Sequence, residues 1–96
     1  MTRKTDTFTE KVRDVVKHIS KGTVLSYGQV AKLAGNGKAA RAVANVMAHN
    51  YDPAVHCHRV VRADGGLGGY NRGGTDAKAR LLISEGVTVQ DKRIIF

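Results

Sequence analysis

The feature that most constrains the fold is a pair of short helix patterns separated by a glycine-bearing turn. Ser26 followed by Gln29 forms a capping-box pattern, which predicts the start of a short helix, YGQVAKLA, ending at Gly35. After a turn at residues 35–37, the segment KAARAVANVMA is rich in residues that favour helix. Two short helices joined by a tight turn indicate a helix-turn-helix, whose second helix can enter a groove of DNA.

The second of these helices has one apolar face built mostly from small residues. The members of this face are Ala40, Val43, Ala44 and Met47. Small side chains let a helix backbone approach a groove closely, whereas bulky ones would hold it away. The same pattern is also common in well-packed helices, so taken alone it favours DNA binding only weakly.

A further helix pattern precedes this pair, in TFTEKVRDVVKHIS. Thr7 with Glu10 predicts a capping box, and Gly22 stands where the helix should stop. Apolar residues recur at three- and four-residue steps along it, at Phe8, Val12, Val15, Val16 and Ile19.

The second half of the chain begins with a long segment at residues 50–76. VHCHRVV within it has extended or short-strand character, and ADGG predicts a turn. Thr75 or Asp76 should cap a helix, DAKARLLISEG, which ends at Gly86, and the tail VTVQDKRIIF should form a hairpin. The residues of that helix expected to face inward are Ala77, Leu81 and Leu82.

These patterns predict a single domain over residues 1–96. The expected fold class is mainly α with a few short strands, a helix-turn-helix or winged-helix-like DNA-binding domain. A loop as long as the one around VHCHRVV is usually functional in so small a domain.

Charge indicates the class of partner. Sixteen Lys and Arg residues against eight Asp and Glu give a net charge of +8 and a pI near 10.1. This excess favours a polyanion, nucleic acid first, although a basic surface kept for solubility is the alternative. We expect no membrane partner, because neither a spanning segment nor a basic amphipathic helix is evident. The single cysteine suits a reducing compartment, so we expect the cytoplasm (nucleoid-associated) or the nucleus.

That cysteine, Cys57, stands between His56 and His58, with Arg59 next and His49 nearby. A metal site is the first reading of such a cluster. Neighbouring side chains in an extended segment face opposite ways, so three consecutive ligands cannot reach one ion. Structural zinc sites also space their ligands differently. We therefore expect no metal.

A nucleophilic thiol is the second reading. Direct contact between Cys57 and His58 is awkward for neighbours, but a bridging water would let the imidazole take the thiol proton. Arg59 would favour the thiolate, and Glu85 could orient the imidazole. A buried cysteine that acts only as a small apolar side chain remains the alternative.

Four segments in order resemble one known family. SYGQVAKLAG, KAARAVANVM, HCHRVVRADGGLGGY and KARLLISEG, between about residues 8 and 87, are similar to the C-terminal domain of the O6-alkylguanine-DNA alkyltransferases. The resemblance implies a helix-turn-helix in the minor groove and a damaged guanine rotated out of the stack, because its O6 atom is inaccessible inside the duplex. It implies a monomer that binds double-stranded DNA containing O6-alkylguanine and needs no cofactor.

The resemblance also implies residue roles on the DNA side. Arg41 would fill the space left by the extruded base, a role that suits its planar, forked cation. Tyr27 would lie by the phosphate of the rotated nucleotide. Other DNA contacts are expected at Ser26, Lys38, Ala40, Ala42 and Ala44.

In the pocket, the resemblance implies that Cys57 accepts the alkyl group. His58 would act as base through water, Glu85 would orient it, and Tyr70 would donate to the base. Asn50 would brace the turn that carries the thiol. The expected pocket contacts are His56 and the backbones of Val60 and Asn71.

Three features depart from the family pattern. His56 replaces a proline, NRGG follows Tyr70, and the N-terminal domain of the usual enzymes has no counterpart. The short length also resembles the alkyltransferase-like proteins, which bind the same lesions without transfer and flag them for nucleotide excision repair. Those proteins typically lack the cysteine, so we predict transfer to Cys57, with lesion binding as the alternative.

Overall fold

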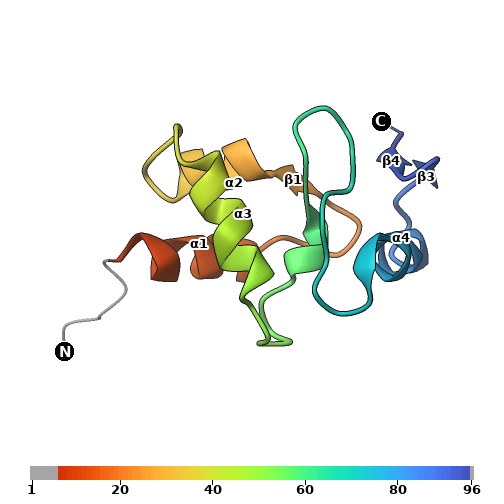
Figure 1. The fold of residues 1–96 in the computed structure, drawn as a ribbon, viewed down its shortest axis with the longest axis horizontal. Helices are drawn as coiled ribbons and strands as arrows, with labels where there is room; N and C mark the ends of the chain where they lie inside the picture. Colours follow the sequence, from red (N-terminus) through yellow and green to blue (C-terminus); the bar gives the residue numbers. More distant parts are fainter. Residues whose placement is uncertain (1–6, 96) are drawn as a thin grey trace.

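The computed structural model describes residues 7–95, and its centre is the predicted helix-turn-helix. Helix α2 (Tyr27–Leu33) and helix α3 (Ala40–Ala48) pack together, with α1 (Phe8–Lys17) against both (Figure 1). The capping box of α2 is confirmed: the Ser26 amide donates to Gln29 Oε1 at 2.8 Å, and the Gln29 amide donates to Ser26 Oγ at 3.0 Å. The predicted class, mainly helical with a few short strands, is confirmed.

Helix α3 begins at Ala40, two residues later than the pattern suggested. The Lys38 amide donates to Asn36 Oδ1 at 3.2 Å, and the Ala39 amide donates to the Asn36 carbonyl at 3.1 Å. The asparagine thus holds these amides in a turn instead of a helix. Lys38 lies exposed before the first turn of α3.

Helix α1 ends at Lys17, so the prediction that it runs to Gly22 is wrong. His18 closes it, with its Nδ1 2.8 Å from the Asp14 carbonyl oxygen, and the chain then turns to bury Ile19. At the other end only half of the predicted box forms. Thr7 Oγ1 accepts from the Glu10 amide, but Glu10 bonds the Thr7 hydroxyl and not its backbone.

The main core lies between the three helices and a two-stranded parallel sheet. Strand β1 (Leu25–Ser26) pairs with β2 (Val60–Val61), and Leu25 stands opposite Val60. The core therefore joins the first half of the chain to the segment that carries Cys57. Its buried members include Val12, Val16, Val30, Ala31, Val43, Met47 and Val60.

The segment VHCHRVV is only partly extended, which corrects the prediction. Cys57–Arg59 forms a single 3-10 turn, η1, closed by the Arg59 amide bonding the His56 carbonyl at 2.9 Å. Only Val60–Val61 is strand, because β1 offers a partner over two residues. The thiol is therefore presented on a turn that immediately precedes a sheet.

Helix α4 (Gly74–Ser84) begins at Gly74, with the left-handed Gly73 (φ 119°) before it, so neither Thr75 nor Asp76 is its cap. The expected inward face also needs correction. Leu82 is fully buried and Ala77 partly so, but Leu81 is 37% exposed. Lys78, one turn before Leu82 on the same face, is fully buried in its place.

The predicted C-terminal hairpin is present as β3 (Val89–Gln90) and β4 (Arg93–Ile94). Asp91 and Lys92 at its tip both have positive φ, as a tight two-residue hairpin turn requires. The hairpin packs on the loop after β2, where the Ile94 amide donates to the Gly65 carbonyl at 2.7 Å. No helix within residues 7–95 has the length and apolar character needed to cross a membrane.

Candidate active site

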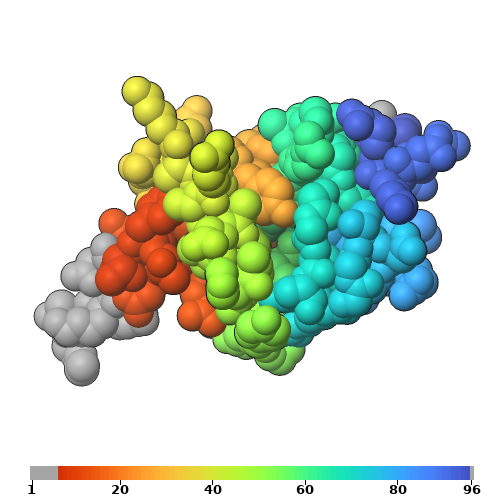
Figure 2. All heavy atoms as spheres, viewed as in Figure 1, coloured from red at the N-terminus to blue at the C-terminus, as the bar shows by residue number. Residues whose placement is uncertain are grey.

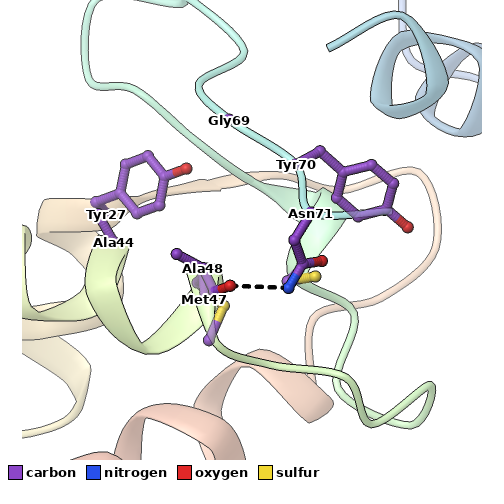
Figure 3. Close-up of a pocket in the computed structure, with 8 residues that line it drawn as sticks. Tyr27, Ala44, Met47, Ala48, Gly69, Tyr70 and Asn71 are labelled. Carbon is purple, nitrogen blue, oxygen red and sulfur yellow. Dashed lines mark hydrogen bonds between the residues drawn. The ribbon is translucent and has the colours of Figure 1, made fainter. Parts of the chain in front are cut away.

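A cavity of about 410 Å³ opens between α3 and the loop that precedes α4. Figure 2 shows the hollow between the yellow-green helix and the cyan loop, and Figure 3 shows its walls. The residues that line it are Tyr27, Ala44, Met47, Ala48, Cys57, Gly69, Tyr70 and Asn71. The single thiol of the chain, only 6% exposed, therefore lies on the wall of this pocket.

The turn that presents Cys57 is braced by Asn50. This side chain is 1% exposed, and its Nδ2 donates to the carbonyls of Asp52 and Val55 at 3.3 and 3.2 Å. Its Oδ1 accepts from the Asp52 amide. Because the Cys57 amide in turn donates to the Val55 carbonyl at 2.9 Å, Asn50 holds the backbone directly before the thiol.

Behind the thiol lies a buried charged network centred on Glu85, the residue that closes α4. His58 Nε2 lies 2.8 Å from Glu85 Oε2. Arg59 donates from Nε to Oε1 at 2.9 Å and from Nη2 to Oε2 at 2.8 Å, and its Nη1 bonds the Ile19 carbonyl. The hydrogen bonds from Arg59, more than those from His58, hold the pKa of Glu85 down to about 2.

An ionised Glu85 determines which nitrogen of His58 carries the proton. The carboxylate can only accept, so Nε2 must donate, and in a neutral ring Nδ1 is left with a free lone pair. Within the described residues no direct hydrogen bond joins Cys57 to His58. In the neutral ring, Nδ1 of His58 is therefore the nitrogen that can accept a proton.

Lys78 is a site residue that sequence reasoning missed. Its ammonium group is fully buried, donates to the carbonyls of Val60 and Gly69 at 2.7 and 3.2 Å, and lies 5.8 Å from the Tyr27 ring centroid. Burial lowers the pKa of Lys78 to about 8, although the nearby Cys57 acts in the opposite direction. The sequence held one indication of its burial: Lys78 lies four residues before Leu82, on the same face of the helix.

The two pocket tyrosines lie on opposite sides of the cavity (Figure 3). Burial, reinforced by Cys57, raises the pKa of both Tyr27 and Tyr70, which keeps their hydroxyls protonated as donors. Gly68 permits the position of Tyr27. A Cβ at Gly68, which has φ 76°, would lie 2.7 Å from the Tyr27 hydroxyl.

A second depression adjoins the pocket and runs along the amino-terminal half of α3. It shares Tyr27, Ala44 and Gly69 with the cavity, and Ala40, Arg41 and Arg62 also line it. Ala42 is exposed beside it, whereas the Ser26 hydroxyl is already occupied by the cap of α2. Asp64 also lines the depression and pairs with Arg62 at 2.9 Å. Between Asp14 and Asp52 the chain carries five Lys and Arg residues and no acidic one, so the side of the depression formed by α2 and α3, with Arg41, is cationic.

Of the three residues predicted to contact the base in the pocket, the structure places only one in the cavity wall. Asn71 lines the cavity, but His56 and Val60 do not. Val60 is fully buried with its carbonyl bound by Lys78, and His56 packs edge-on to His58 at 6.2 Å. Burial, and to a lesser extent the charge of Arg59, lowers the pKa of His56.

Among residues 7–95, no three His, Cys, Asp or Glu side chains gather as metal ligands.

The sequence of the chain matches a known protein family. The model of the 6-O-methylguanine DNA methyltransferase, DNA binding domain, matches residues 7–87. The chain is a member of this family. Curated relatives named methylated-DNA--protein-cysteine methyltransferase share 46% identity over 84 residues in Rattus norvegicus and 43% over 84 in Methanothermobacter thermautotrophicus. The matches cover 85% and 86% of this chain but only 40% and 46% of those relatives.

Solved structures of the methyltransferase family and its kin share the fold. S. pombe Atl1, in complex with damaged DNA containing O6-carboxymethylguanine, matches with a TM-score of 0.79 and 30% identity, over 94% of this chain and 83% of Atl1. Mycobacterium tuberculosis OGT in complex with DNA matches with a TM-score of 0.77 and 40% identity, over 82% of this chain and 48% of OGT. The family resemblance found from the sequence is confirmed.

Proposed function

We propose that this chain is a DNA-repair protein that extrudes O6-alkylguanine from the duplex and transfers the alkyl group to its own Cys57. One observation carries the proposal: the only thiol lines a pocket beside a cationic groove, with a His58–Glu85 pair behind it. A cavity of about 410 Å³ lies within the range usual for small-molecule sites. The groove and pocket share a wall, so a base rotated out of DNA bound in the groove would enter the cavity.

The proposed reaction is a single displacement. His58, with Nδ1 unprotonated, takes the Cys57 proton through a bridging water. The thiolate attacks the alkyl carbon, the S–C bond forms and the C–O6 bond breaks with its electron pair passing to the purine. The purine then takes up a proton and becomes ordinary guanine, with a tyrosine hydroxyl of the pocket, Tyr70, donating to the departing base.

The acceptor is consumed by this reaction. A thioether is stable to the side chains that line the pocket in the described part of the chain, so each molecule would act once. Arg41, on the groove beside the pocket mouth, is proposed to occupy the space left in the duplex. Extrusion costs a few kcal/mol of unstacking, and stacking by a guanidinium offsets part of that cost.

The deciding experiment measures the mass of the intact protein after incubation with a duplex that carries O6-methylguanine. We expect the mass to rise by one methyl group, the modified peptide to contain Cys57, and the DNA to be returned to guanine. Cys57→Ala should bind the same duplex without gaining mass. Tight binding by the unaltered chain with no methyl gained would overturn transfer.

The alternative function, lesion binding without transfer, has one specific observation in its favour. Atl1, solved with DNA containing O6-carboxymethylguanine, matches 94% of this chain with a TM-score of 0.79, against 82% and 0.77 for OGT. In that case the chain would mark O6-alkylguanine for nucleotide excision repair proteins. The mass measurement separates the two functions, because both predict tight binding and only one predicts methylation.

A further inference from the structure

Asn71 links two walls of the pocket. It belongs to the loop wall, and its Nδ2 donates to the Ala48 carbonyl at 2.9 Å, the bond drawn in Figure 3. The same Nδ2 donates to the Asn50 carbonyl at 2.8 Å. Ala48 is the last residue of α3, where carbonyls lose their partners within the helix. The asparagine therefore ties the loop wall to the end of the helix that forms the opposite wall.

The orientation of this amide is determined by its partners. Nδ2 faces two carbonyl oxygens, so a rotated amide would place Oδ1 against two acceptors. In the observed orientation Oδ1 is buried and, among the described residues, has no hydrogen-bond partner. An unpaired buried acceptor is unfavourable, so Asn71 is not the best choice for stability alone.

Little else restrains this wall on the α3 side. Within residues 7–95, no other hydrogen bond connects residues 69–71 to α3 or to Asn50. A Cβ at Gly69 would meet nothing within 4 Å, and Gly73 and Gly74 both have positive φ. Lys78 holds the Gly69 carbonyl, but it does so from α4. Without the two bonds of Asn71, the loop wall could move away from α3.

We propose that Asn71 is a positioning residue that sets the width of the pocket and so restricts transfer to small alkyl groups. The inference rests on the proposed transfer to Cys57. Displacement requires the alkyl carbon to lie against the sulfur, and the space there is bounded by α3 on one side and the loop on the other. If these walls separate, a bulky benzyl group gains room at the sulfur that a methyl group does not need.

Asn71→Asp tests the link without changing side-chain volume. Aspartate has nearly the same shape but no N–H donors, so both bonds are lost. The measurement is the rate of transfer from duplexes carrying O6-methylguanine or O6-benzylguanine. We expect the benzyl-to-methyl rate ratio to rise by about 10-fold, a typical effect of altered pocket fit. Asn71→Ser, whose hydroxyl is too short to reach both carbonyls, should change the ratio in the same direction if the aspartate variant folds poorly.

Asn45→Ala is the matched control. This exposed asparagine is also on α3, but it lies beside Thr9 and Arg13 on the α1 side. It should leave the ratio unchanged. A purely structural role for Asn71 would lower the melting temperature and slow both transfers equally, and an unchanged ratio in the Asn71 variants would overturn the proposal.

The same variants separate this inference from the proposed function. If the unaltered chain transfers nothing, the affinities for the two duplexes replace the rates. A benzyl-to-methyl affinity ratio that rises in Asn71→Asp would retain the pocket-width role while transfer fails. A ratio unchanged in both rate and affinity would overturn the role of Asn71 whatever the outcome for transfer.

Discussion

At the scale of single residues, the site depends on buried charges that balance one another. Glu85 accepts from both His58 and Arg59, so a carboxylate that would be costly to bury alone is fully paired. An unusual cluster and a family resemblance in the sequence predicted roles for Cys57, His58 and Glu85, and the structure places Cys57 in the pocket wall and joins His58 to Glu85. Sequence reasoning missed Lys78, because a lysine in an amphipathic helix is normally solvated and only the packed structure shows it enclosed.

The paired Glu85 predicts a specific loss of stability in acid. Its pKa in the folded chain is about 2, below the ordinary value of 4.5. A lowered folded pKa contributes stability that is fully present above the ordinary value and is lost as the pH falls from about 4.5 to about 2. Over that window the free energy of unfolding should fall further in the unaltered chain than in Glu85→Gln, measured by denaturant titration.

Asp76→Asn provides the comparison for this acid effect. Asp76 is exposed, and its Oδ1 lies as far as 4.0 Å from Lys92 Nζ, so this surface ion pair contributes little. Its removal should therefore leave the acid-induced fall in stability unchanged. Equal acid sensitivity of Glu85→Gln and the unaltered chain would show that the network around Glu85 contributes nothing to the pH dependence.

At the scale of elements, local signals predicted some boundaries and tertiary contacts determined others. The start of α2 was predictable because Ser26 and Gln29 satisfy each other within one turn. The 3-10 turn at Cys57–Arg59 was not, since it exists where the chain enters a two-residue pairing with β1. Likewise α4 starts at Gly74, whose amide bonds the Tyr70 carbonyl, a local contact with no capping signature in the sequence.

The cap of α2 should contribute measurably to stability. Ser26→Ala removes the acceptor for the Gln29 amide, which should cost about 1 kcal/mol of unfolding free energy. Ser26→Asn keeps a capping oxygen and should cost much less. The chain has no tryptophan, so circular dichroism is the suitable probe in denaturant titrations. If alanine and asparagine destabilise equally, the cap is not the source of the effect.

At the scale of the whole molecule, the pocket and the cationic face belong to one surface. The acid-free stretch between Asp14 and Asp52 includes all of α2 and α3, whereas the acidic residues lie before or after it. Composition gives only the net charge of +8, whereas the order of the residues shows that helices α2 and α3 lie in a stretch without acidic residues. The matches cover about 40% of the length of the mammalian relatives, yet Cys57, the His58–Glu85 pair and the groove all fall within residues 7–95.

The cationic face predicts how binding to undamaged duplex depends on salt. Phosphate contacts release counterions, so the logarithm of the association constant should fall linearly with the logarithm of salt concentration. Lys38→Gln, which removes one exposed cation before α3, should reduce the slope by about 1 without altering sequence preference. Lys11→Gln, on α1 and outside both pocket and groove, should leave the slope unchanged. Fluorescence anisotropy of a labelled duplex measures both, and a response that is flat with salt would mean that the +8 serves no phosphate contacts.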